Sequence, residues 1–329
     1  MVGFSKIIGQ EHIKEHLQGA IQSRMINHAY ILQGEAGMGK KMIEDTFAIT
    51  VQCERGEEEP CMTCHSCKQA LSGNQPDIRY LIPEKEGVIK VNEIREQVIG
   101  DVAIKPYSSP YKVYIIPDAD TMNAAAQNAL LKTLEEPPAY VIILLLCKNA
   151  ELLLETIRSR CILLNIRPLT DEQVKTYLMQ NMQIPDYKAT ICAAFARGSI
   201  GRAKMLLKND DFEELRQETS QLLKSIPSMD IMEISEEIKR ISGLSVGITE
   251  FLDYLYLWYR DILLCKATGK TEKLLHLEDR QMIGMIADRC SYESIAHVLA
   301  VIEETKARIN ANVNPDMALE LLLLALKEN

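Results

Sequence analysis

Residues 34–41 read Gly34-Glu35-Ala36-Gly37-Met38-Gly39-Lys40-Lys41. They follow the pattern G-x-x-x-x-G-K-[ST] of a phosphate-binding loop, in which backbone N–H groups surround a phosphate and the lysine reaches the terminal phosphates. The last position departs from the pattern, because Lys41 stands where a Ser or Thr hydroxyl would hold Mg²⁺. An ammonium group cannot ligate a cation. The sequence therefore predicts a loop that can hold phosphate but is poorly equipped to position the metal for phosphoryl transfer.

Short apolar segments alternate with helical stretches around this loop. Residues 29–33 lead directly into it, and residues 40–53 are expected to form the helix whose N-terminus would face phosphate. Further strands are expected at 78–82, 113–116, 141–146 and 161–164, and helices at 91–102 and 123–136. Because the strands are apolar throughout, the pattern predicts an α/β domain with a parallel sheet buried on both faces.

Helical periodicity runs from about residue 167 to the end of the chain. We expect an α/β domain at 1–166, a small helical domain at 167–209 and an all-α domain at 210–329. Residues 317–326 are apolar on nearly every side, which predicts a core helix. An oligomer interface is the second interpretation, and both can hold because such a helix needs partners all round.

The net charge and the distribution of apolar residues argue against some classes of protein. The net charge of −9 over 329 residues argues against a protein coated with basic, phosphate-binding surface, though not against a local basic patch. The N-terminus lacks the apolar core of a signal peptide, and the most apolar run, residues 140–147, is too short to span a bilayer. We expect a cytoplasmic protein without membrane contact.

Four of the nine cysteines follow the spacing C-x7-C-x2-C-x2-C: Cys53, Cys61, Cys64 and Cys67. In a reducing cytosol this spacing favours a Zn²⁺ site, with a redox pair or an iron–sulfur cluster as alternatives. His65 is the one plausible substitute ligand. Four thiolates leave no open coordination position, so the zinc in this module (residues 53–67) would be structural.

Several motifs converge on one family. In chain order they are Phe4, Ile8-Gly9-Gln10, His28-Ala29-Tyr30, the string Asn-Ala-Leu-Leu-Lys-Thr-Leu-Glu-Glu-Pro-Pro at 128–138, and Thr-Ile-Arg-Ser-Arg-Cys at 156–161. Their order and spacing resemble the bacterial clamp-loader ATPases of the AAA+ class over residues 1–210. The resemblance implies an AAA+ P-loop domain with a four-cysteine zinc module, a small helical lid domain, and a C-terminal helical collar domain for oligomerisation.

This family contains ATP-hydrolysing subunits and a non-hydrolysing stator, which differ at the catalytic positions. One register places Pro117 and Asp118 at the metal and base positions, and a shift by one places Asp118 and Ala119 there. Neither yields an Asp-Glu pair. The sensor position, usually a polar hydroxyl or amide, falls near Cys147-Lys148. With Lys41, three elements depart from what phosphoryl transfer needs, so the resemblance implies the stator and no ATP hydrolysis by this chain alone.

The motif Ser159-Arg160-Cys161 is intact. The resemblance implies that Arg160 is an arginine finger supplied in trans to the γ-phosphate of a neighbouring subunit, a role worth about 10³–10⁵ in rate in other NTPases. The alternative is an arginine paired with a carboxylate on its own surface. The neighbouring Arg158 is expected to meet solvent or an acidic partner.

Residues 198–202, Gly-Ser-Ile-Gly-Arg, resemble the second sensor of the family. Arg202 is expected either to contact nucleotide or to begin a helix in a lid that no longer closes. The candidate ATP or ADP site therefore comprises Gly34, Gly37, Gly39, Lys40 and Arg202.

The resemblance implies as partners the gamma/tau and delta subunits of the loader, and the sliding clamp and primed DNA through the complex. Lys132 is a candidate contact to the duplex backbone, the alternative being a solvated lysine on an amphipathic helix. Lys105 and Lys112 are no better candidates than Lys132 for contact with the DNA backbone.

Two other functions fit part of the sequence. The first is a gamma/tau-type ATPase that works with an unusual phosphate-binding loop. The second is a zinc-dependent nucleic-acid-binding module that uses the cysteine cluster. Against the second stand the acidic residues next to that cluster, Glu54, Glu57, Glu58 and Glu59, because they would repel phosphate.

Overall fold

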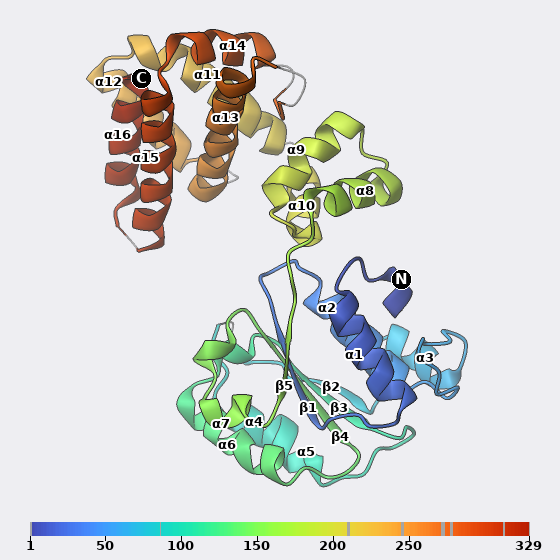
Figure 1. The fold of residues 1–329 in the computed structure, drawn as a ribbon. Coiled ribbons are helices and arrows are strands. Elements are labelled where there is room, and N and C mark those ends of the chain that lie inside the picture. The colour runs from blue at the N-terminus through green and yellow to red at the C-terminus, as the bar shows by residue number, and fades with distance from the viewer. Residues whose placement is uncertain are drawn as a thin grey trace. The chain divides into compact units, whose positions relative to one another are not determined.

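The computed structural model describes residues 2–85, 87–208, 211–244, 247–270, 274–276, 279–311 and 313–328 (Figure 1). The chain divides into two compact units, Met1–Gln173 with Arg197–Arg202, and Val174–Ala196 with Ala203–Asn329. The first unit thus extends a few residues past the expected boundary at 166. A separate small helical domain at 167–209 and a collar domain at 210–329 stay predictions.

A five-stranded parallel sheet in the order β2-β3-β4-β1-β5 forms the centre of the first unit. Its strands are β1 (Ala29–Gln33), β2 (Ile78–Tyr80), β3 (Lys112–Ile116), β4 (Val141–Cys147) and β5 (Ile162–Asn165). All five expected strands are present, with ends shifted by two residues or fewer. Every residue of β4 is buried, as a central strand covered on both faces requires. The predicted α/β fold with a parallel sheet is confirmed. Burial on both faces holds for β1, β3 and β4, whereas the edge strands β2 and β5 are partly exposed.

Helices cover both faces of this sheet (Figure 1). One face carries α1 (Glu11–Gln22) and α2 (Lys40–Val51), with α3 (His65–Leu71) beside α2, and the other carries α4 (Val91–Ile94), α6 (Ala124–Glu135) and α7 (Glu155–Arg158). Because side chains alternate along a strand, Tyr30 and Leu32 pack with α1 and α2, whereas Ala29 and Ile31 pack toward α6.

The helix expected at 91–102 is interrupted. It begins as α4, continues as a π-helical turn at Arg95–Ile99 and ends as α5 (Gly100–Val102). Gln97 lies in this turn, and its side-chain amide donates to the Ile82 carbonyl and accepts from the Ile82 N–H, both at 2.9 Å. The turn therefore holds the backbone that follows β2.

Among the described residues that follow β5, the regular elements are helices, as expected. They are α8 (Asp171–Met182), α9 (Asp186–Ala196), α10 (Ile200–Lys208), α11 (Asp211–Ser225), α12 (Ile231–Ser242), α13 (Ile248–Thr268), α14 (Arg280–Arg289), α15 (Tyr292–Asn310) and α16 (Pro315–Lys327). Single 3₁₀ turns lie at Phe4–Lys6, Ala119–Thr121, Ala150–Leu152 and Ile226–Ser228. None of the described helices combines the length and the apolar character needed to cross a bilayer.

The C-terminal apolar segment forms α16, and one face of it belongs to the core of the second unit. Leu319, Leu322 and Leu323 are fully buried there, in the same cluster as Trp258. On the opposite side Met317, Leu321 and Leu324 are 63%, 50% and 39% exposed, respectively. The core helix is thereby present, and the oligomer interface stays a prediction for the exposed stripe.

Candidate functional site

The phosphate-binding loop lies between β1 and α2, as its sequence predicts. Gly37 and Gly39 adopt positive φ angles of 76° and 97°, which side chains with a Cβ rarely tolerate. The Lys40 ammonium donates to the carbonyl of Gly34 and, at 3.1 Å, to that of Glu35. The loop therefore has the expected glycine-dependent shape, and its lysine is bound by backbone carbonyls of the same loop.

Negative groups surround Lys40 at the carboxyl ends of the neighbouring strands. Burial lowers the pKa of Lys40, and the nearby charges of Asp118, Asp120 and Glu35 oppose that shift. At the position expected from the sequence for the sensor, burial raises the pKa of Cys147 to about 12, so this thiol is neutral at physiological pH. A neutral thiol at the end of β4 is a poor substitute for the polar side chain that senses a phosphate.

Asp120 is a member of this site that was not expected from the sequence. Its Oδ2 accepts the N–H groups of Lys148 (3.0 Å) and Asn149 (3.2 Å), which follow β4. Asp118, the residue considered for the metal or base position, has a left-handed backbone with φ 44°. The carboxylate of Asp120 thus accepts hydrogen bonds from backbone N–H groups. A second acid two residues after Asp118 is the only sequence signal for it.

Lys41, at the position of the missing hydroxyl, contacts the next turn of α2. Its ammonium lies 3.5 Å from Glu44 Oε1, 3.6 Å from Asp45 Oδ1, and 5.0 Å above the centre of the Tyr80 ring. The Tyr80 hydroxyl in turn donates to Asp45 at 2.7 Å. Glu44 is only 3% exposed, and its burial raises its pKa to about 7 despite the charge of Lys41. Lys41 therefore belongs to a local charge cluster on α2.

The segment that resembles a second sensor lies on the phosphate-binding loop. The Gly201 N–H donates to the Gly37 carbonyl at 2.9 Å, and the Ser199 hydroxyl donates to the Ala36 carbonyl at 3.2 Å. A Cβ built on Gly37 would lie 3.1 Å from the backbone nitrogen of Arg202. The structure thus brings the backbone of Arg202 next to the predicted phosphate-binding residues.

Arg160 follows α7 and is 35% exposed. Its Nη2 lies 2.9 Å from Glu135 Oε1, and its Nη1 donates to the Thr156 carbonyl at 2.9 Å and to the Ser159 hydroxyl at 3.2 Å. The alternative expected from the sequence, an arginine paired with a carboxylate of its own surface, describes this arrangement. A trans role requires that arrangement to change.

The four clustered cysteines come together as predicted. Their Sγ atoms lie within 4.8 Å of one another, in the order Cys53, Cys61, Cys64 and Cys67 along the chain. Backbone N–H groups donate to three of the sulfur atoms at 3.3–3.5 Å. Hydrogen bonds from Thr63 lower the pKa of Cys61 to about 5, whereas burial raises that of Cys67. The set can hold a metal ion, and His65 is not part of it among the residues described.

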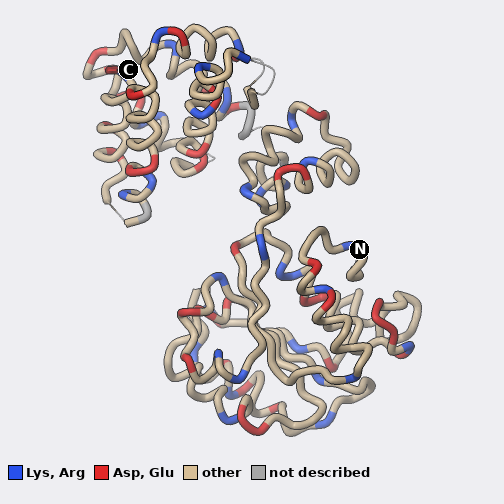
Figure 2. Tube along the Cα trace, viewed as in Figure 1, with Lys and Arg blue, Asp and Glu red and all other residues tan. Residues whose placement is uncertain are grey.

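Two of the acidic residues beside this cluster have structural roles. Glu59 accepts the N–H groups of Phe4 (2.9 Å) and Ser5 (2.7 Å), and Phe4 is only 1% exposed. Glu54 accepts the N–H of Ser66 at 3.2 Å. Elsewhere acidic and basic residues are interspersed along both units (Figure 2). From the sequence, Glu54 and Glu59 were expected only to repel phosphate.

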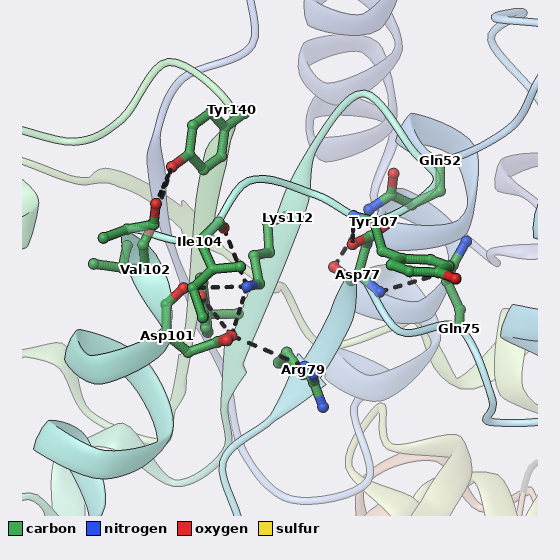
Figure 3. A network of polar contacts seen from close by, with 12 residues as sticks. Gln52, Gln75, Asp77, Arg79, Asp101, Val102, Ile104, Tyr107, Lys112 and Tyr140 are labelled. Carbon is green, nitrogen blue, oxygen red and sulfur yellow. Dashed lines mark hydrogen bonds and ion pairs between the residues drawn. The ribbon is translucent and has the colours of Figure 1, made fainter.

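A polar network that the sequence did not reveal holds the chain before β3 (Figure 3). Asp77, 1% exposed, accepts the N–H groups of Tyr107, Ser108 and Ser109 at 2.6–3.0 Å. Gln75 links this loop to the cysteine module, because its amide donates to the hydroxyls of Ser109 (3.1 Å) and Ser66 (2.7 Å).

Lys112 belongs to the neighbouring part of this network. It is 3% exposed and lies 2.8 Å from Asp101 Oδ2. A lysine buried in an ion pair does not meet a DNA backbone. Lys132, the DNA candidate on α6, is exposed.

This chain is similar to subunits of bacterial DNA polymerase III. Residues 9–170 match the family model described as DNA polymerase III, delta subunit. The DNA polymerase III subunit delta' of Bacillus subtilis is 29% identical over 97% of this chain and 96% of its own length. That of Pseudomonas aeruginosa is 27% identical over 90% of each chain. The tau subunit of Bacillus subtilis is 29% identical over 83% of this chain but over only 52% of its own length. Residues 9–170 of this chain, about half of its length, therefore belong to the DNA polymerase III, delta subunit family.

Proposed function

We propose that this chain is the delta' subunit of a bacterial DNA polymerase III clamp loader. In this role it is a stator that takes part in ATP-dependent loading of the sliding clamp during DNA replication and hydrolyses no ATP itself. Its partners are the gamma/tau and delta subunits and, through the complex, the sliding clamp and primed DNA in the cytoplasm. The similarity to a delta' subunit over 97% of the chain supports this choice.

The environment of Lys41 is the observation that carries the proposal. A phosphate-binding loop that hydrolyses ATP uses the hydroxyl at this position to hold Mg²⁺, which bridges the phosphates and neutralises developing charge. Here the position carries an ammonium that is bound to Glu44 and Asp45 on α2. The loop keeps its fold and loses a part that hydrolysis requires.

The degenerate nucleotide site comprises Gly34, Gly37, Gly39, Lys40 and Arg202. ATP or ADP would have to draw the Lys40 ammonium away from the carbonyls of Gly34 and Glu35. The nucleotide would also have to bind to a loop whose carbonyls already accept hydrogen bonds from Ser199 and Gly201. Both features weigh against tight nucleotide binding, and neither removes the glycine-lined backbone that can surround a phosphate.

We assign a structural Zn²⁺ to Cys53, Cys61, Cys64 and Cys67. A tetrahedral site with Zn–S bonds of about 2.3 Å has sulfur atoms about 3.8 Å apart, which fits a cluster whose sulfurs all lie within 4.8 Å. The N–H groups that donate to the sulfurs orient the ligands and stabilise thiolates. Bound zinc would close the module and supply no chemistry, because all four positions are taken by protein sulfur.

Arg160 is the residue that we propose to act on a neighbouring nucleotide. In the assembled loader its guanidinium would stabilise the charge on the γ-phosphoryl group of ATP bound to the adjacent gamma/tau subunit, while water adds and ADP leaves. Its partial exposure of 35% at the end of α7 supports such access.

The test has two parts. The isolated chain should show no more ATP turnover than its Lys40→Ala variant. In a loader reconstituted with gamma/tau and delta, Arg160→Ala should lower ATP turnover and clamp loading. The matched control is Arg158→Ala, an exposed arginine two positions away, which should change neither. Sustained, Lys40-dependent turnover by the isolated chain would favour the gamma/tau-type ATPase, and a loader unaffected by Arg160→Ala would remove the finger role.

A further inference from the structure

Both terminal nitrogens of Arg160 are engaged within its own unit. Nη2 lies 2.9 Å from Oε1 of Glu135, the last residue of α6. Nη1 donates to the Thr156 carbonyl and the Ser159 hydroxyl at 2.9 and 3.2 Å. These three acceptors come from two helical segments, and only Glu135 carries a charge. Glu135 is therefore the strongest competitor for the guanidinium.

Recognition of a phosphoryl group uses the same nitrogens. A guanidinium binds phosphate best through paired N–H groups that point in one direction, in a two-pronged contact. Nη2 can join such a contact only after it leaves Glu135. Nη1 donates its hydrogen bonds to a backbone carbonyl and a side-chain hydroxyl of the segment that carries Arg160 itself, so they can keep the arginine oriented after the carboxylate is exchanged.

We propose that Glu135 is a positioning residue that holds Arg160 on the surface of its own unit until a neighbouring γ-phosphate replaces it. This inference rests on the proposed trans role of Arg160. Glu135 and Arg160 are 49% and 35% exposed, and an ion pair with this exposure shifts an equilibrium by up to about five-fold. A restraint of this size slows premature hydrolysis and is small enough for assembly on clamp and DNA to overcome.

The experiment uses the reconstituted loader with Glu135→Gln, which keeps the shape of the side chain and removes its charge. ATP turnover without clamp and DNA should rise by about two- to five-fold at the site next to this chain, while KM for ATP stays unchanged. Glu135→Asp, which keeps the carboxylate, should return turnover toward the original value. Glu136→Gln is the matched control, because Glu136 is an exposed neighbour of the same charge.

The double variant Glu135→Gln, Arg160→Ala separates the inference from the proposed function. If Glu135 acts through Arg160, the double variant should behave like Arg160→Ala alone. Reduced turnover with Arg160→Ala together with an unchanged Glu135→Gln loader would overturn the role of Glu135 and leave the finger in place. Unchanged turnover with Arg160→Ala would overturn both. A rise with Glu135→Gln that persists in the double variant would also overturn the role of Glu135.

Discussion

Gly201 lies directly against Gly37, and its N–H donates a 2.9 Å hydrogen bond to the Gly37 carbonyl. A Cβ at Gly201 would come within 2.4 Å of the Gly37 Cα and within 2.8 Å of its carbonyl oxygen. Because both of these atoms belong to the backbone, no side chain can move to make room. The absence of a side chain at Gly201 thus lets the start of α10 reach the phosphate-binding loop.

Gly201→Ala should destabilise the first unit by about 1–3 kcal/mol, since the added methyl group forces two backbone segments apart. The control is Gly19→Ala in α1, where a Cβ meets nothing within 4 Å. It should stabilise by about 0.5–1 kcal/mol through helix propensity. Hydrogen exchange of the β4 amides measures opening of this unit. If the two variants changed the opening free energy of the β4 amides in the same direction, the close contact between Gly201 and Gly37 would be contradicted.

Glu44 should make the first unit less stable as pH rises. Its pKa is about 7 in the folded chain, against an ordinary value of 4.5. Between these values the folded chain holds a proton that the unfolded chain has released, so stability falls with rising pH. Glu44→Gln should remove this dependence and stabilise the unit by about 3 kcal/mol at pH 8, with a smaller gain at pH 5.

Exchange of the β4 amides between pH 5 and 8, corrected for intrinsic rates, checks the Glu44 prediction. The control is Glu15→Gln in α1, an exposed glutamate of the same unit, whose effect should not vary with pH. If the stability gained by Glu44→Gln stayed constant over this pH range, Glu44 would have an ordinary pKa in the folded chain.

The elements that were predicted from sequence depend on short-range patterns. The apolar runs of β1 and β4 and the glycines of the phosphate-binding loop are local signals, and each predicts its structure without knowledge of distant residues. The cysteine cluster is also local, since Cys53 and Cys67 lie 14 positions apart. These features account for the sheet, the loop and the cysteine cluster.

The features that were missed depend on distant pairs. Asp120 binds backbone groups 28 and 29 positions away, and Asp77 binds those 30 to 32 positions away. Glu135 meets Arg160 only because α6 and α7 pack on the same face of the sheet. An isolated acidic residue carries no sign of such a partner, because the partner is usually a backbone N–H that every residue has. Contacts of this kind follow from the fold.

Asp77→Asn should loosen the loop before β3. The neutral amide loses charge-assisted hydrogen bonds to the N–H groups of Tyr107, Ser108 and Ser109, at a cost of about 1–3 kcal/mol. Exchange of these three amides should therefore accelerate. Ser108→Ala is the control, because it removes only the 3.3 Å contact of its hydroxyl with Asp77 and keeps the N–H. Comparable acceleration in both variants would show that the carboxylate does not hold the loop.

Zinc in the cysteine module should order the N-terminal segment through Glu59. This residue lies between Cys53 and Cys61 and accepts the N–H groups of Phe4 and Ser5 at 2.9 and 2.7 Å. Glu59→Ala should speed exchange of those two amides by about ten-fold while the chain keeps about one zinc ion. Glu58→Ala, an exposed neighbour, should not. Chelation of zinc from the unmodified chain should speed the same exchange. Without the metal, the four cysteines no longer hold the segment between Cys53 and Cys61, which carries Glu59. Slow exchange after complete chelation would show that Glu59 holds this segment without help from the metal.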